Sequence, residues 1–162
     1  MEVKVFVEIP KGSRNKYEQD EKTGELVLDR ALYGEEVFPF DYGFIPETRG
    51  EDGDPLDVVL LVTNPTFPGC IMKAEVIGYL EMEDESGIDN KVLLVPTKKL
   101  DPRWAHVRDI GDLTDKQRQE IRDFFENYKK LEPGKWVKLK EFKPKAEAEQ
   151  LIQAAKERLG KG

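Results

Sequence analysis

The sequence contains one cysteine and one histidine in 162 residues. A lone Cys70 cannot form a disulfide within the chain, so a reducing compartment is expected, with Cys70 as an ordinary small packed residue. A single histidine, His106 in the WAHVRD segment, gives little support to a Ser-His-Asp or Cys-His catalytic site. We expect His106 to have a structural or interface role.

Long hydrophobic runs and an excess of positive charge are also absent. No apolar window approaches the roughly 20 residues of a membrane helix. The opening MEVKVFVEIPKG predicts a strand rather than a signal peptide. A net charge of −7 opposes binding to nucleic acid or an anionic membrane. We therefore expect a cytoplasmic protein with neither partner.

Alternating apolar residues predict strands through most of the chain. Residues 3–9, VKVFVEI, place Val3, Val5, Val7 and Ile9 on one face. A hairpin is expected around Lys22-Thr23-Gly24. Further strands are predicted at 37–45, 57–63, 70–83, 91–97 and 135–142. The turn-rich segments 64–70 and 98–112 are expected to be surface loops.

Two helices are predicted after these strands. Thr114 and Gln117 form a capping-box pattern, and four apolar residues then share one helical face, namely Ile121, Phe124, Phe125 and Tyr128. The second helix is expected from about Pro144 to Leu159. Strands followed by helices, with no repeat or linker, predict a single α+β, mainly β domain over residues 1–162.

An acidic turn precedes the strand expected at 57–63. Glu51, Asp52, Asp54 and Asp57 fall within seven residues, around a Gly53 that allows a tight turn. Ionised carboxylates beside a core are costly unless they are paired or bind metal, and oxygen ligands suit Mg²⁺. We expect a divalent cation here; a solvated acidic turn is the alternative. An EF-hand loop is excluded, because its sixth position would need glycine rather than Asp57.

A second acidic turn, EMEDESGIDNK at 81–91, places Asp84 and Asp89 on either side of Gly87. Two acidic turns at strand ends favour a site for several metal ions. Basic residues accompany them at Lys16, Arg30, Lys91 and Lys129. Metals ringed by cations are typical of phosphoryl transfer, where charge on phosphate oxygens must be offset. The sequence has no Walker loop and no GxGxxG motif.

These segments resemble the soluble family I inorganic pyrophosphatases of the bacterial type. The resemblance covers essentially the whole chain. It rests on VEIPKGSRNKYE near the start, LDR at 28–30, FDYGFIPET at 40–48, DGDPLDVVLL at 52–61, DESGIDNK at 84–91, HVRDIGDL at 106–113 and FFENYKKLEPGKW at 124–136. The D-x-D-P-x-D element is the most specific of these.

The resemblance implies Mg²⁺-dependent hydrolysis of inorganic pyrophosphate to two orthophosphates, with Mn²⁺ or Zn²⁺ able to substitute. A metal-bridged water would attack, with Asp54 as its base. Asp52, Asp57 and Asp89 would hold the first metal, and Asp57 would also touch the second. Asp84 would bind a metal that arrives with substrate.

The remaining site residues are also implied by the resemblance. Glu8 and Glu18 would be supporting carboxylates. The groups that would grip the two phosphoryl units are Lys16, Arg30, Tyr42, Lys91, Tyr128 and Lys129. The chain departs from many bacterial members at Phe38, where they have tyrosine, so one phenol is missing.

The family fold is an OB-like closed five-stranded barrel with extra hairpin strands and two packed C-terminal helices. Bacterial members are usually homohexamers, so a homo-oligomer is expected. Two other functions stay open. One is a non-catalytic OB module that binds metal or phosphate, although an oligonucleotide-binding module would interleave aromatic residues with a basic groove. The other is a nucleotide phosphohydrolase, which would need stacking aromatics around a base.

Overall fold

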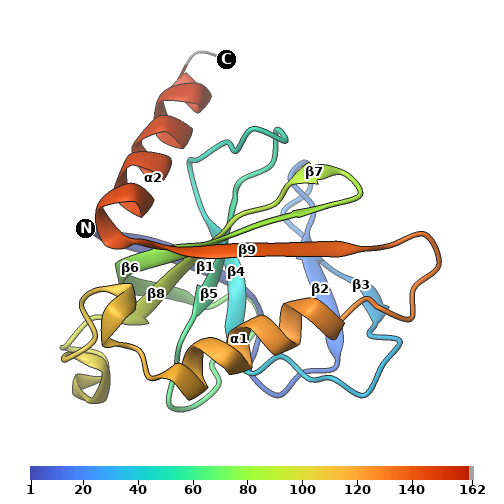
Figure 1. Cartoon of the computed structure of the whole chain (residues 1–162). Coiled ribbons are helices and arrows are strands. Elements are labelled where there is room, and N and C mark those ends of the chain that lie inside the picture. The colour runs from blue at the N-terminus through green and yellow to red at the C-terminus, as the bar shows by residue number, and fades with distance from the viewer. Residues whose placement is uncertain (161–162) are drawn as a thin grey trace.

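Five strands close into a barrel in the computed structural model, which describes residues 1–160 (Figure 1). The strands are β1 (Glu2–Ile9), β2 (Asn15–Gln19), β3 (Leu26–Ala31), β4 (Asp41–Ile45), β5 (Leu56–Leu60), β6 (Ile71–Asp84), β7 (Gly87–Ile88), β8 (Lys91–Pro96) and β9 (Val137–Pro144). The helices are α1 (Asp115–Asn127) and α2 (Lys145–Gly160), with short 3-10 turns η1 (Pro102–Trp104) and η2 (Ile110–Asp112).

The barrel order is β1-β4-β5-β8-β6, and pairing between β6 and β1 closes it. Only the β5–β8 pair is parallel among these neighbours. β7 and β9 extend the sheet from β6, while β2 and β3 form a separate hairpin. The predicted OB-like barrel with extra strands and two helices is therefore confirmed.

A glycine permits the close approach of two barrel strands. Gly43 on β4 lies opposite Val7 on β1. A Cβ atom at position 43 would come within 1.9 Å of the Phe6 carbonyl oxygen, so any side chain would push the strands apart. This close contact holds β4 against β1. The neighbouring residue Tyr42 lines the cleft described below.

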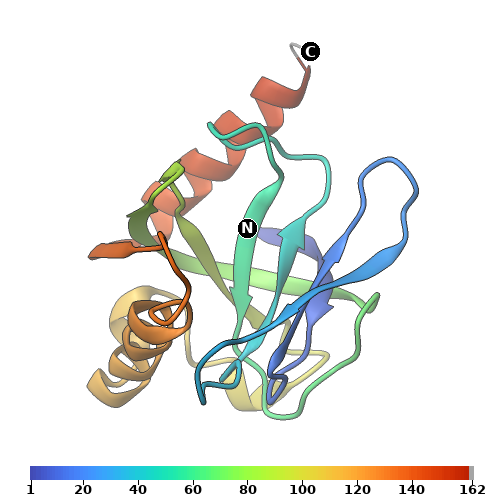
Figure 2. The same cartoon turned by 90° about the vertical axis from the view of Figure 1, so that its right-hand side faces the viewer.

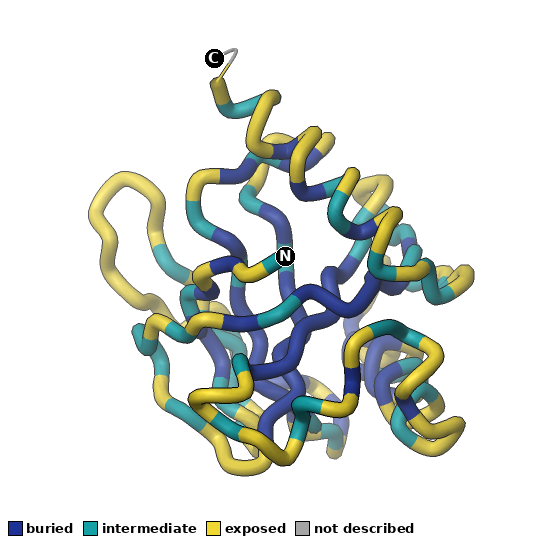
Figure 3. Tube along the Cα trace, turned by 90° about the vertical axis from the view of Figure 1, so that its left-hand side faces the viewer, coloured by how far each residue is buried: buried dark blue, intermediate teal, exposed yellow. Residues whose placement is uncertain are grey.

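The central strands are apolar on both faces, because each face packs against a different cluster. Val59 and Leu93 belong to the cluster that packs against α1, whereas Val58 and Leu94 belong to the one that packs against α2. Figure 3 shows the buried residues gathered along the central strands, with exposed residues concentrated in the loops and on the outer helix faces. The predicted apolar face of α1 is confirmed at its buried residues, Ile121, Phe124 and Phe125, and α2 buries Ala148, Ile152 and Ala155.

Several predicted strand ends differ from the structure by up to three residues, as at 57–63, where β5 spans Leu56–Leu60, and part of one predicted strand is absent. Residues 37–40 are not a strand: Pro39 has no N–H, and Phe38 instead exchanges hydrogen bonds with the loop after β1, through Ser13 O and Gly12 N. Pro144 ends β9 rather than starting a helix, and the side chain of Asp109 accepts a hydrogen bond from the first amide of α2 at Lys145. The 98–112 segment contains η1 and η2 within the expected loop.

None of the helices described has both the length and the apolar character needed to cross a membrane.

Candidate active site

A cleft of about 1140 Å³ opens beside the barrel. The residues that line it come from the β2–β3 hairpin, the loop between β4 and β5, the turn between β6 and β8, and the end of α1. Figures 1 and 2 show where these elements lie in the fold. Every residue predicted for the site lines this one cleft, namely Glu8, Lys16, Glu18, Arg30, Tyr42, Asp52, Asp54, Asp57, Asp84, Asp89, Lys91, Tyr128 and Lys129. Their individual roles stay predictions.

The acidic turn is preorganised by its own backbone. Gly53 has a φ of 89°, in the left-handed region that glycine adopts without strain. The amide of Asp54 donates to Asp52 Oδ1 at 3.0 Å, and the amide of Gly50 donates to the Asp54 carbonyl at 2.7 Å. The turn thus presents the carboxylates of Asp52, Asp54 and Asp57 to the cleft.

Helix α2 and a buried threonine hold the loop that carries this turn. The Arg49 amide donates to the Ala155 carbonyl at 3.0 Å, and the Arg158 guanidinium donates to the Arg49 carbonyl at 2.6 Å. Within the loop, Thr48 Oγ1 donates to the Ile45 carbonyl and accepts from the Leu56 amide. These contacts fix the acidic turn to the barrel at both ends.

Lys91 lies between the two acidic turns. Its side chain is only 3% exposed, and its Nζ donates to Asp57 and Asp89, each at 2.9 Å, and to the Tyr42 hydroxyl at 2.7 Å. Burial alone lowers the pKa of Lys91, but the surrounding acids outweigh it and hold the pKa well above its usual value. Lys91 is therefore a fixed positive charge at the base of the cleft.

The acids around this lysine form what we call the carboxylate side, made up of Glu8, Glu18, Asp52, Asp54, Asp57 and Asp89. Burial raises the pKa of Glu8 to about 7 and that of Asp89 to about 6, with repulsion from Asp57 adding to both. The pKa of Asp54 is also raised, first by burial and then by Asp52. These acids outnumber Lys91, the lysine hydrogen-bonded to two of them.

The donor set on the carboxylate side fits a hard divalent cation. Its groups are oxygens only, and the pKa values of Glu8, Asp54 and Asp89 are raised first by burial and further by neighbouring carboxylates, both of which disfavour the charged form without a bound cation. Within residues 1–160 no three acidic, histidine or cysteine side chains converge closely enough to enclose an ion by themselves. Mg²⁺ does not require a ready-made cage of protein ligands, because it usually keeps several waters in its coordination shell.

A second group of charged residues in the cleft is the cation side, made up of Lys16, Arg30, Tyr128 and Lys129 with the acids that pair with them, Asp29, Asp84 and Glu85. Lys129 donates to Asp84 at 3.0 Å and to Glu85 at 3.3 Å. Lys16 lies 3.5 Å from Asp29, which also accepts from Arg30. Burial raises the pKa of Asp29 and Asp84, but the adjacent cations outweigh it, and both values are lowered.

Aromatic packing holds the end of α1 against the cleft. The Tyr128 ring stacks on Phe124, with centroids 5.2 Å apart. Phe38 packs behind them, 4.6 Å from Phe124 and 5.6 Å from Tyr42, and it does not line the cleft. Phe38, which stands where many bacterial members have tyrosine, is therefore a core residue in this protein.

Some polar residues at the site escaped sequence reasoning. Asp29 and Glu85 pair with the cleft lysines, and Glu132 pairs with Arg30 across 102 sequence positions. Asp29 and Glu85 are next in sequence to the predicted site residues Arg30 and Asp84, and this proximity could have marked them as candidates. No local pattern marks Glu132.

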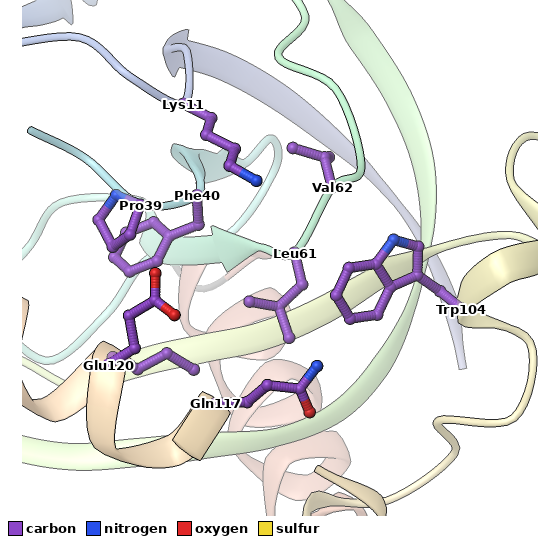
Figure 4. Close-up of a pocket in the computed structure, with 9 residues that line it drawn as sticks. Lys11, Pro39, Phe40, Leu61, Val62, Trp104, Gln117 and Glu120 are labelled. Atoms are coloured by element: carbon purple, nitrogen blue, oxygen red, sulfur yellow. The ribbon is translucent and has the colours of Figure 1, made fainter. Parts of the chain in front are cut away.

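Two features lie outside the cleft. His106 is exposed and does not line it. A smaller pocket of about 120 Å³ lies between α1 and the end of β5, with Phe40, Leu61 and Trp104 around it and Lys11 at its rim (Figure 4). None of the predicted site residues belongs to this pocket.

Comparison with known proteins agrees with the geometry. The family model described as "Inorganic pyrophosphatase" matches residues 5–160. The inorganic pyrophosphatase of Nanoarchaeum equitans is 51% identical over 157 residues, which is 97% of each chain. That of Leifsonia xyli is 51% identical over 150 residues, covering 93% of this chain and 91% of the relative.

Solved structures agree as well. An inorganic pyrophosphatase from Helicobacter pylori has a TM-score of 0.96 at 43% identity, covering 98% of this chain and 94% of that one. The Thermus thermophilus inorganic pyrophosphatase has a TM-score of 0.95 at 46% identity, covering 99% and 92%. The chain therefore belongs to the inorganic pyrophosphatase family.

Proposed function

We propose that this protein hydrolyses inorganic pyrophosphate to two orthophosphates with Mg²⁺ as its cofactor. Family membership supports the reaction, since the relatives are named for it. The observation that carries the proposal is the cleft itself, which brings a group of carboxylates together with lysine and arginine. A small, highly charged anion bound with cations fits such a site better than a neutral ligand does.

The carboxylate side would hold the metal. Asp52, Asp57 and Asp89 would be the direct ligands, Asp84 would join when substrate is present, and Glu8 and Glu18 would support the site. When bound, Mg²⁺ would offset phosphate charge and make a water more acidic. Mn²⁺ or Zn²⁺ would substitute, because the donors accept other divalent ions.

Asp54 would act as the general base. Its carboxylate lines the cleft, and its raised pKa favours proton acceptance over that of an ordinary aspartate. It would take a proton from the attacking water while the water oxygen bonds to one phosphorus. The bond from that phosphorus to the bridging oxygen would break, and the bridging oxygen would leave with the second phosphate.

The cation side would bind the leaving phosphate. Lys16, Arg30 and Lys129 would offset charge as it develops on the leaving oxygen, and Tyr128 would donate a hydrogen bond. Lys91 and Tyr42, already hydrogen-bonded to each other at 2.7 Å, would contact the phosphoryl group under attack. Positioning and charge would supply most of the rate enhancement, as expected for phosphoryl transfer.

Orthophosphate release from pyrophosphate and from ATP, each with Mg²⁺ and with EDTA, tests the function. Release from pyrophosphate alone, stopped by EDTA, is expected. Comparable release from ATP would favour the nucleotide phosphohydrolase. No release with any divalent metal would favour the binding module.

The assembly and compartment are part of the same proposal. We propose that residues 1–162 form one domain and that the protein works in the cytoplasm. We also propose that it assembles into a homo-oligomer, with six subunits as the expected number. The lone Cys70 suits a reducing compartment. Light scattering after size-exclusion chromatography measures the subunit number; a monomeric mass would contradict the assembly.

A further inference from the structure

A buried acid outside the cleft contacts one of the cleft cations. Glu132 is among the few buried charged residues of the described chain, and it does not line the cleft. Its Oε1 lies 2.8 Å from Arg30 Nε, and its Oε2 accepts a hydrogen bond from Arg30 Nη2 at 3.0 Å. Both carboxylate oxygens therefore lie against the guanidinium, one through the hydrogen bond from Nη2 and the other through a close ion-pair contact at Nε that is not aligned as a hydrogen bond, and together they hold Arg30 in place.

Arg30 has a second acidic neighbour, but the two acids differ in kind. Asp29 is 35% exposed, and its Oδ2 contacts both Arg30 and Lys16. Glu132 is 7% exposed, and Arg30 is the cation in contact with it. An exposed, shared acid constrains an arginine weakly, whereas a buried acid with one partner is costly unless that partner stays in place.

The backbone around Glu132 is also fixed. Its amide donates to the Lys129 carbonyl at 3.1 Å, and its carbonyl accepts from the Lys135 amide at 3.3 Å. The turn that follows α1 therefore starts at Lys129, a residue of the cation side, and ends at Glu132, whose side chain contacts Arg30 on β3. Arg30 is connected in this way to the end of α1, where Tyr128 and Lys129 lie.

We propose that Glu132 is a positioning residue that aims the Arg30 guanidinium into the cleft. The proposal rests on the function proposed above, because Arg30 would contact the leaving phosphate there. Glu132 itself would touch no substrate. Its effect on turnover would pass entirely through Arg30, and this dependence separates it from a residue that only stabilises the fold.

A double-mutant cycle tests that dependence. Glu132→Gln keeps the size of the side chain and removes its charge, and it is expected to lower kcat/KM for pyrophosphate on the order of tenfold, because a hydrogen bond to a charged group is lost. In an Arg30→Ala background the same substitution is expected to change kcat/KM by less than about twofold, since additivity fails for residues that act together. Glu132→Asp, which keeps the charge, should restore part of the loss.

The control is Glu126→Gln, which makes the same change at an exposed position on α1 and should leave kcat/KM unchanged. An equal loss from Glu132→Gln with and without Arg30 would overturn the proposal in favour of general structural support. An unchanged kcat/KM in the single variant would overturn it as well.

A second measurement does not depend on turnover. An arginine clamped by a carboxylate rotates slowly about its guanidinium bonds, so separate Nη proton signals are expected for Arg30 in nuclear magnetic resonance spectra. Glu132→Gln should merge them, and Glu126→Gln should not. Merged signals in the unsubstituted protein would overturn the positioning role. Absence of pyrophosphate hydrolysis, with Arg30 still clamped, would instead overturn the proposed function alone.

Discussion

The carboxylate side and the cation side of the cleft differ in how their acidic groups are compensated. On the cation side, lysine and arginine already pair with Asp29 and Asp84, and the pKa values of both acids are lowered. On the carboxylate side, Lys91 is shared by two acids, and the pKa values of Glu8, Asp54 and Asp89 are raised. On the cation side the acids are paired with lysine or arginine, whereas on the carboxylate side burial and neighbouring acids raise the pKa of three carboxyl groups.

This difference indicates where an added charge of each sign would go. A cation would reduce repulsion on the carboxylate side and gain little on the other. An anion would compete for the cations that Asp29, Asp84 and Glu85 now occupy. The two sides of the cleft therefore differ in charge balance before any ligand is present.

The largest effect is expected from Asp54→Asn. Removing the proposed base should lower turnover about a hundredfold or more, while Mg²⁺ affinity stays close to that of the unsubstituted protein. Turnover of pyrophosphate and calorimetric titration with Mg²⁺ measure the two quantities. Glu51→Gln is the matched control, because Glu51 is an exposed acid of the same turn that does not line the cleft. Retention of most turnover by Asp54→Asn would contradict the base assignment.

Asp57→Asn should break the carboxylate side in another way. It removes a proposed metal ligand and leaves Lys91 with Asp89 as its acidic partner. Mg²⁺ affinity should fall on the order of tenfold or more, as measured by calorimetry without substrate. Asp123→Asn, at an exposed position on α1, should bind Mg²⁺ as before. Unchanged affinity in Asp57→Asn would place the metal elsewhere.

Added Mg²⁺ should stabilise the protein. At a hundredfold excess over Kd, binding to the native state contributes about 2.7 kcal/mol, which corresponds to roughly 5–10 °C in melting temperature for a chain of this size. Thermal melting with Mg²⁺ and with EDTA measures this shift. Asp57→Asn should reduce it and Glu51→Gln should not. Equal melting temperatures in Mg²⁺ and EDTA would argue against a metal on the carboxylate side.

The smallest effect is expected from Phe38→Tyr, at a position outside both sides of the cleft. Phe38 packs among aromatic rings and does not line the cleft, so turnover should change by less than about twofold. A hydroxyl buried there without a partner should cost about 1–3 kcal/mol of unfolding free energy. Urea unfolding and pyrophosphate turnover provide the two readings. A large gain in turnover would show that the hydroxyl reaches the cleft.

Local signals in the sequence predicted most of the fold. Alternation located β1, the capping box located α1, and the acidic turns marked the end of β6 and the start of β5. The error at 37–40 arose because Phe38 and Phe40 have strand-like alternation, although Pro39 cannot donate to a ladder. Such a segment is apolar because it packs against α1, not because it pairs with a strand.

The contacts that organise the site were harder to predict because they join distant positions. Lys91 meets Tyr42 across 49 positions, and Arg30 meets Glu132 across 102. These contacts depend on barrel closure and on where the turn after α1 ends. Residue types alone indicated a metal and phosphate site, and the resemblance supplied its members. Neither identified which acid clamps which cation.

Strand β6 also has a consequence for the speed of folding. Glu2 pairs with Glu75 where β6 closes the barrel, whereas Asp84 at its other end pairs with Val137 of β9. Contacts between residues so far apart in the sequence form slowly, because a large loop must first be closed. The β2–β3 hairpin can form locally and early, but the two sides of the cleft come together only after β6 has found its partners. The chain should therefore fold more slowly than a helical protein of the same length.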